Sequence, residues 1–323
     1  MEMVVRSVAY RAGKRLKDVV IDDISEVVQE PGTFIWVGLW QPDEPLLRKM
    51  QEEFHLHDLA IEDALNAHQR PKLEVYGDSL FVVVKTAQLT EGEVQYGETH
   101  VFIGKNFLVT VRHGASTSYG EVRARLECNP ALLGKGPAFA LYSVLDFIVD
   151  HYQPIMSSYE AQFDRIEANL FKADFNEKTI EETYELRHQL MELRNAAAPI
   201  HEICNQLIRF HEELIPKELR AYLRDVQDHA QRVVAATDDL REMLTNAMHV
   251  NLALVTVRQN EIVKRLAGWG AIFALPTVVF SLYGMNFQDM PELKTSWGYP
   301  ATLAVTVTGC VALYRKLKRE AWI

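Results

Sequence analysis

Residues 283 to 300, YGMNFQDMPELKTSWGYP, separate two apolar stretches that carry no charged side chain. The first runs from Leu266 to Phe287 and the second from Trp297 to Tyr314. At about 1.5 Å per helical residue, the first is long enough to cross a hydrocarbon core of about 30 Å. One such stretch also fits a buried helix of a soluble protein. Two in tandem around a short polar loop predict a membrane hairpin, with transmembrane helices at 264–287 and 297–314.

Charged residues beside these stretches predict how the hairpin is oriented. A Lys-Arg pair at 264–265 precedes the first stretch, and four more basic residues lie in the tail at 315–323. The loop at 288–296 instead holds two acidic residues, Asp289 and Glu292, and one lysine. Because basic residues favour the cytoplasmic side, we expect both termini in the cytoplasm and the loop outside an inner (plasma) membrane. Asp289 and Glu292 would then give the outer mouth a modest negative field.

The first part of the chain predicts a cytosolic α/β domain over residues 1–137. Between Met3 and Arg112, apolar runs rich in strand-forming residues are punctuated by turn residues such as Pro31-Gly32 and Glu91-Gly92. The runs are MVVRSVAY, TFIWVGLW, SLFVVVK, VQYGETHVFIG and NFLVTVR. Between them, Glu44 to Ala67 has the three and four spacing of a helix. The fold class is therefore α+β, with an α/β domain followed by helices.

Residues 138–263 predict a cytosolic helical region that includes a long stalk helix. Beyond Pro216 the chain contains no proline until Pro276 and no glycine until Gly268. A helix from about Lys217 into the membrane would be about 100 Å long. Such a helix is not stable alone in water, so a bundle of identical copies is the simplest arrangement.

Composition excludes several classes of function. The net charge of −10 is concentrated between Ser157 and Val250, where acidic residues outnumber basic ones, which argues against nucleic acid and favours cations. The three cysteines are isolated, so neither a disulfide framework nor a thiolate metal site is indicated. No phosphate-binding loop, nucleophile elbow or H-E-x-x-H pattern occurs, so we expect no catalytic residues and no enzyme activity. The N-terminus lacks the apolar region of a cleaved signal.

Small and polar residues form a seam along the first predicted span. Their spacing alternates between three and four, which places them on one helix face. The seam consists of Asn260, Val263, Ala267, Gly270, Ala274, Thr277, Ser281 and Gly284. One interpretation is that this face lines a pore within a ring of copies, and the other is close helix packing through small residues. Both can hold together, because helices around a narrow pore also need small contacts.

At the loop, the sequence resembles the CorA family of magnesium and cobalt channels. The resemblance rests on YGMNF followed by MPEL and WGYP between two apolar segments, and on the basic tail RKLKREAWI. It extends more loosely to IEDALNAHQRPKLE at 61–74 and YLRDVQDH at 222–229, so it covers the full length. It implies a homopentameric funnel that conducts divalent cations, magnesium first and cobalt or nickel as well.

The resemblance also implies roles for residues of the pore. Gly284, Met285 and Asn286 would form the selectivity filter, Asn260 and Thr277 would line the pore, and Val263 or Leu266 would form a hydrophobic constriction. Magnesium dehydrates reluctantly and prefers oxygen ligands, so a neutral ring of amide and carbonyl oxygens can hold the hydrated ion through its waters. Weak, repeated binding of this kind suits conduction. Without the resemblance, Gly-Met-Asn would be interpreted as a helix C-cap.

Regulatory magnesium sites are implied at acidic positions of the cytosolic part. In the CorA family, such sites between subunits keep the channel closed, and Asp63 and Asp225 match their acids, while Glu62 and His229 match more weakly. A further acidic position of the family falls at Asp150 or His151. Asp225 and His229 are four residues apart and so share a helix face.

Alternatives remain at this point. The chain fits a zinc transporter of the same superfamily, and it fits a membrane-tethered metal sensor or scaffold that does not conduct. The motif His55-Leu56-His57-Asp58 suits a surface loop better than a zinc site, because no third ligand lies nearby. The expected partners are further copies of the chain and membrane lipid.

Overall fold

The structure, a computed structural model, describes residues 3–170, 177–211, 213–286 and 290–323. It divides into two compact units, Met1–Thr245 and Asn246–Ile323.

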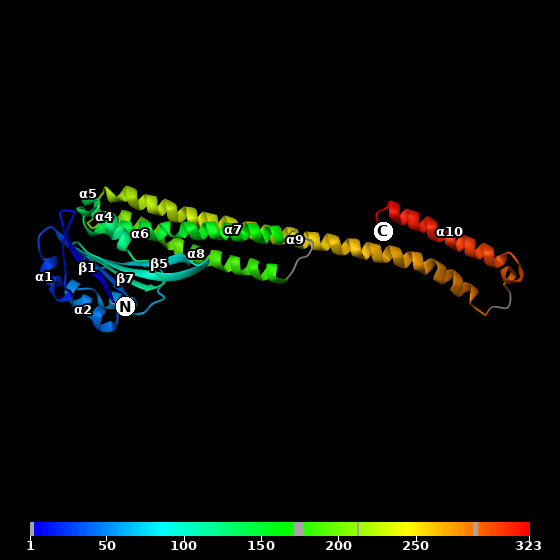
Figure 1. The fold of residues 1–323 in the computed structure, drawn as a ribbon, viewed down its shortest axis with the longest axis horizontal. Helices are drawn as coiled ribbons and strands as arrows, with labels where there is room; N and C mark the ends of the chain where they lie inside the picture. The colour runs from blue at the N-terminus through cyan, green and yellow to red at the C-terminus, as the bar shows by residue number, and fades with distance from the viewer. Residues whose placement is uncertain (1–2, 171–176, 212, 287–289) are drawn as a thin grey trace. The chain divides into compact units, whose positions relative to one another are not determined.

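A seven-stranded sheet forms the centre of the first unit (Figure 1). The strand order is β2-β1-β3-β7-β6-β5-β4, and all neighbours are antiparallel except β3 and β7, which pair in parallel with Ile35 opposite Phe107. The strands are β1 (Val4–Arg11), β2 (Lys14–Asp18), β3 (Thr33–Trp40), β4 (Lys72–Tyr76), β5 (Ser79–Thr90), β6 (Glu93–Ile103) and β7 (Phe107–Gly114). The sheet therefore consists of two antiparallel parts joined by one parallel pair.

Helices cover both faces of this sheet. One face packs on η1 (Ile21–Asp23), α1 (Ile24–Val28), α2 (Glu44–Phe54) and α3 (Asp58–Leu65). The other face contacts α6 (Pro137–Asp150), α7 (Tyr152–Leu170) and α8 (Glu177–Phe210), with the short α4 (Gly120–Glu127) and α5 (Pro130–Leu133) at their start (Figure 1). Burial on both faces explains why the central strands are continuous apolar runs rather than alternating ones.

The five predicted strand runs are confirmed as β1, β3, β5, β6 and β7. The Glu91-Gly92 turn is confirmed as well, because both residues have positive φ between β5 and β6. Strands β2 and β4 were not predicted. They are short edge strands, and β2 is exposed along its whole length, so neither carries the apolar signal of a buried strand.

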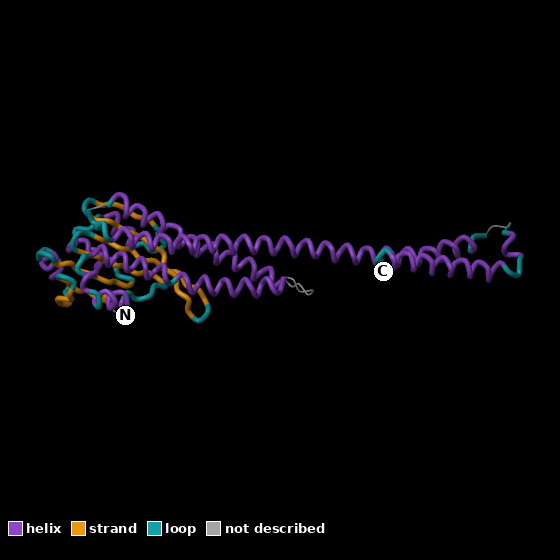
Figure 2. Tube along the Cα trace, turned by 90° about the horizontal axis from the view of Figure 1, so that it is seen from above, coloured by secondary structure: helices purple, strands orange, loops and turns teal. Residues whose placement is uncertain are grey.

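The predicted long helix is confirmed as α9 (Leu219–Tyr283), which runs for 65 residues (Figure 2). Pro276 lies inside it, and Pro199 lies inside α8. Among the described residues, α9 is the one helix that is long and apolar enough to cross a membrane, by length and composition.

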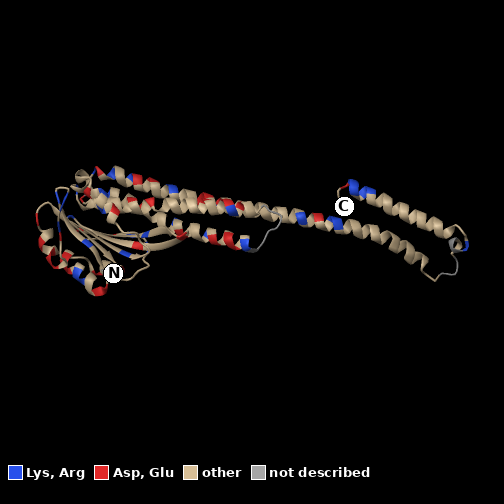
Figure 3. Ribbon diagram, in the orientation of Figure 1, with Lys and Arg blue, Asp and Glu red and all other residues tan. Residues whose placement is uncertain are grey.

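In the second unit, η2 (Pro291–Lys294) and α10 (Gly298–Arg319) follow the end of α9. Helix α10 packs antiparallel on α9: the ring of Tyr314 lies 6.4 Å from that of Trp269, and the Cys310 thiol donates to the carbonyl of Ile272 at 3.8 Å. Figure 3 shows that charged residues are sparse along both helices of this hairpin, with Lys and Arg gathered at the C-terminal end of α10. This distribution agrees with an apolar hairpin that has a basic end.

Candidate functional site

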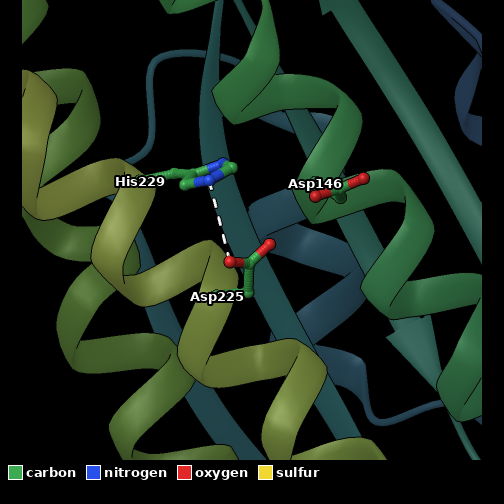
Figure 4. A group of neighbouring side chains, drawn as sticks. All are labelled: Asp146, Asp225 and His229. Carbon is green, nitrogen blue, oxygen red and sulfur yellow. Dashed lines mark ion pairs between the residues drawn. The ribbon is translucent and has the colours of Figure 1, made fainter.

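Three side chains of the first unit converge from two helices (Figure 4). Asp146 comes from α6, and Asp225 and His229 come from α9, where their spacing of four residues places them one helical turn apart. One ligand atom from each lies within 4.8 Å of the others. The Nε2 atom of His229 lies 3.7 Å from Asp225 Oδ1, and its Nδ1 atom lies 4.0 Å from Asp150 Oδ1. We call these four residues the acidic cluster.

The electrostatics of the acidic cluster favour a cation. Burial and then the neighbouring carboxylate of Asp150 raise the pKa of Asp146 above its ordinary value, and Asp225 adds to this, while His229 opposes it. Burial, followed by the charges of Asp146 and Asp225, raises the pKa of Tyr142 to about 12. The carboxylates thus repel one another, and an ion that bridges them relieves the repulsion.

The donor set of the acidic cluster is mixed. Carboxylate oxygens suit magnesium, which keeps several of its waters and takes few protein ligands. The imidazole of His229 suits cobalt, nickel or zinc better. The cluster is open to water, since Asp225 is exposed and His229 is partly exposed, so a hydrated ion can reach it. The residues present therefore fit a divalent cation.

Sequence reasoning found part of this cluster. It named Asp225 and His229, and it named Asp150 or His151 as a further position. The structure brings Asp150 to the cluster. The His151 ring instead hydrogen-bonds to the carbonyl of Phe147 at 2.7 Å. Sequence reasoning missed Asp146. A signal was available, because Asp146 precedes Asp150 by one turn in an otherwise apolar helix.

Glu62 and Asp63 lie elsewhere, on α3. Asp63 Oδ2 accepts from Lys72 Nζ at 2.6 Å, and Lys72 also contacts Glu74 at 2.9 Å, whereas Glu62 is exposed. Within one chain these two acids do not join the acidic cluster. Their predicted place in a site shared between subunits stays a prediction.

The predicted pore seam lies on the side of α9 that faces away from α10. Gly268 is buried and Ile272 and Leu275 are half-buried on the side of α9 that contacts α10. At 100° per residue, the seam from Ala267 to Gly284 falls on the opposite side. All eight seam residues, Val263 included, are exposed, and so is Leu266. This exposed face, which we call the pore face, is free to meet other copies of α9.

The Gly-Met-Asn motif directly follows the last turn of α9. The Gly284 N–H donates to the carbonyl of Phe280 at 2.9 Å, and Gly284 does not adopt the left-handed conformation that favours a glycine C-cap. Gly284, Met285 and Asn286 are all exposed. They therefore lie at one end of the pore face, and their role as a selectivity filter stays a prediction.

Two predicted features fall outside what the structure describes. Asp289 lies outside the described residues, and so does the side chain of Glu292. The His55 to Asp58 motif, by contrast, has a structural role: His57 caps α3 by accepting from the N–H of Leu59, and its ring stacks on Tyr76 at 4.4 Å.

Comparison with known proteins places most of the chain in one family. Residues 31–319 match the family described as CorA-like Mg2+ transporter protein. The chain is 30% identical to the cobalt/magnesium transport protein CorA of Thermotoga maritima, over 93% of this chain and 87% of that protein. It is 28% identical to the putative metal ion transporter YfjQ of Bacillus subtilis, over 93% of each.

Solved structures agree on the fold. The complete structure of the CorA magnesium transporter from Methanocaldococcus jannaschii matches with a TM-score of 0.79 at 22% identity, over 99% of both chains. The ZntB cytoplasmic domain from Vibrio parahaemolyticus matches with a TM-score of 0.62 at 13% identity, over 79% of this chain and 99% of that one. At these identities the likeness concerns the fold alone.

Proposed function

The chain belongs to the CorA-like Mg2+ transporter family, and from this membership we propose that it is a magnesium channel whose pore is lined by α9. The family is one of transporters for divalent cations rather than enzymes.

The observation that carries the proposal is the pore face. It joins Asn260, Thr277 and Ser281 with small residues on one exposed side of α9, opposite the contact with α10. Polar side chains in a membrane-spanning helix face a helix partner or water rather than lipid. Copies of α9 around a common axis satisfy this requirement, and the resemblance noted above makes the number of copies five. Helix α10 would be the second span, with both termini in the cytoplasm.

Selectivity would reside in Gly284, Met285 and Asn286. The amide oxygen of Asn286 and backbone carbonyls near Gly284 offer neutral ligands to the hydration shell of magnesium. Neutral ligands bind the ion weakly enough for it to leave again. Cobalt and nickel, which accept the same ligands, are further candidates for transport.

Regulation would use the acidic cluster together with Asp63 of a neighbouring subunit. When cytosolic magnesium is scarce, the unbridged carboxylates of Asp146 and Asp225 and that of the neighbouring subunit's Asp63 repel one another. The subunits then move apart, and the constriction near Val263 and Leu266 opens. When magnesium returns, it bridges the carboxylates and the channel closes. This is a negative feedback on uptake.

The test is ion uptake into proteoliposomes. The full-length protein should admit magnesium, and cobalt to a lesser extent, without a proton gradient. Asn286→Ala should lower magnesium uptake at least about tenfold, because the first ligands of the hydrated ion are lost. A matched control is Asn205→Ala on α8, which should leave uptake unchanged. Zinc uptake that depends on a proton gradient, with no magnesium uptake, would replace this proposal with the zinc transporter.

A second measurement addresses regulation. Asp225→Asn should keep uptake but weaken its inhibition by magnesium on the cytosolic side. Unchanged inhibition in that variant would remove the acidic cluster from the gate while leaving the pore proposal intact.

A further inference from the structure

A second polar site lies in the first unit, apart from the residues of the acidic cluster. It is a cavity of about 480 Å³ between the sheet, the loop that follows α3 and the helix α8. Its size is within the range of small-molecule sites. Much of its wall is apolar or backbone. The charged side chains in it are those of Arg70, Lys85, Glu98 and Glu192, and its neutral polar side chains include His113 and Asn195.

The carboxylate of Glu98 is buried in the wall of this cavity and held by hydrogen bonds. Its exposed fraction is 2%, and both oxygens are occupied: the N–H of His68 donates at 2.6 Å, Lys85 Nζ donates at 2.6 Å, and His100 Nε2 lies at 3.2 Å. His68 has a φ of 76°, in the left-handed region that costs a non-glycine residue energy. The hydrogen bond to Glu98 therefore holds the loop after α3 in a strained conformation.

His113 contributes a buried group that lacks a partner. The residue is 9% exposed and lines the cavity, and among the described residues its Nε2 atom has no hydrogen-bond partner. Its ring also hydrogen-bonds to the backbone of Ala64 on α3. A buried polar atom without a partner is costly. Nε2 exposes almost no surface in the free protein, so a bound molecule supplies its partner only by turning the ring towards the cavity.

Arg70 contributes an available positive charge. It is exposed at the cavity, and no ion pair involves it in the part of the chain that the structure describes. Lys85 is already paired with Glu98, and the remaining charge near the cavity is the exposed carboxylate of Glu192. One free guanidinium next to two carboxylates suits a single negative charge and disfavours a double one.

From these observations we propose that the cavity binds a small organic acid with one carboxylate and an apolar body. The carboxylate contacts Arg70 and, once the His113 ring has turned towards the cavity, its protonated Nε2, while the body packs on the apolar wall. Free inorganic phosphate, with up to two charges and no apolar part, does not fit these groups.

Binding of this kind takes up a proton. Burial, and then the nearby His100, lower the pKa of His113, so the free protein holds the ring neutral. A bound carboxylate favours the charged ring, and binding therefore strengthens as the pH falls. The charged or titratable groups around the ring and the cavity are Tyr96, Glu98 and His100 of β6, His68 and Arg70 of the loop after α3, Lys85 of β5 and Glu192 of α8.

The cavity is also connected to α3, which carries Asp63. His113 contacts Ala64, the residue that follows Asp63, and Glu98 holds His68 in the same segment. A bound acid would therefore change how α3 is held and, with it, the affinity for magnesium. This coupling rests on the proposed regulatory role of Asp63, whereas binding itself does not.

Calorimetry of the full-length protein in nanodiscs, with benzoate as the probe and without magnesium, tests the binding. We expect saturable binding that is tighter at about pH 6 than at about pH 8, with net proton uptake measured in buffers of different ionisation enthalpy. Arg70→Gln, an exposed change that leaves the fold intact, should weaken binding at least about tenfold. Arg187→Gln, an exposed arginine of α8 outside the cavity, is the matched control.

The outcomes are distinct. No binding of benzoate, equal binding by Arg70→Gln, or inorganic phosphate binding as tightly as benzoate each overturns the proposal. His113→Asn should abolish the proton uptake; if that variant does not fold, the proton count for the wild type still decides. Because the calorimetry involves no magnesium or transport, its failure leaves the proposed channel untouched. Benzoate that binds without altering the magnesium-induced rise in Tm refutes the coupling alone.

Discussion

Replacing Asp146 with asparagine should stabilise the metal-free protein and weaken its response to magnesium. In the acidic cluster, the ligand atoms of Asp146, Asp225 and His229 lie within 4.8 Å of one another. Two unit charges at about that distance repel by about 1 kcal/mol in water and about 3.5 kcal/mol at an effective dielectric constant near 20. Because the Asp225 side chain is 59% exposed, water screens the pair, and the lower value applies. The expected gain is about 1 kcal/mol, or a rise in Tm of about 2 °C.

The sign of the pH dependence follows from the same pair. The pKa of Asp146 is raised from 3.8 by burial and by Asp150, so the folded protein binds this proton more tightly than the unfolded chain. The metal-free protein therefore loses stability as the pH rises from about 3.8 through the raised pKa. The amide introduced by Asp146→Asn does not titrate, so this loss should be absent in the variant.

The assay is thermal unfolding of the full-length protein in detergent, with EDTA or with magnesium. The wild type should show a large rise in Tm with magnesium, and Asp146→Asn should show a higher starting Tm and a smaller rise. Asp164→Asn, at an exposed acid of α7, is the control. A lower Tm in EDTA together with a full magnesium response would refute the assignment of Asp146 to the cation site.

Three further predictions concern other parts of the chain. Although burial would raise the pKa of Glu98, hydrogen bonds with His100 and Lys85 lower it from 4.5 to about 2. Glu98→Gln should therefore lower the free energy of unfolding by about 3 kcal/mol at neutral pH. Denaturant unfolding of the wild type should show this contribution disappear as the pH falls from about 4.5 towards 2. A Cβ atom at Gly268 would lie 2.9 Å from Ile323 Cγ1, whereas at Gly270 nothing lies within 4 Å. Gly268→Ala should therefore displace the C-terminal residues, and carboxypeptidase should digest them faster in this variant than in Gly270→Ala. Equal rates would contradict the contact. Thr277→Val should lower magnesium uptake by proteoliposomes more than Thr308→Val on α10, because the Thr277 hydroxyl lies on the pore face, and equal effects would argue against a pore along that face.

Patterns of apolar residues predicted the buried strands because β3, β5 and β7 are enclosed by helices on both sides, so nearly every position is apolar. Edge strand β2 was not predicted because it is exposed along its whole length, and its sequence KRLKD has the polar composition of a turn. Proline by itself does not mark helix ends in this chain, because Pro199 and Pro276 both lie within helices.

Local sequence patterns pair only the two site residues that share one helix, whereas Asp150 was named through the family resemblance. Asp225 and His229 are linked by helical spacing, so sequence alone can pair them. Asp146 reaches them through the packing of α6 against α9, a contact between distant segments that no local pattern encodes. The buried pair of His100 and His113 was missed for the same reason, because the two residues meet across neighbouring strands.

The parallel pairing of β3 with β7 bears on how the protein acquires its structure. Ile35 must find Phe107, and every residue of α2, α3 and the β4 to β6 meander lies between them. Hairpins such as that of β5 and β6 form from neighbouring residues, so docking the two halves of the sheet is the slow, non-local step of folding. All strands precede the apolar end of α9 in the chain, and on a translating ribosome the sheet emerges first. Its hydrophobic interior can thus close before the hairpin leaves the exit tunnel.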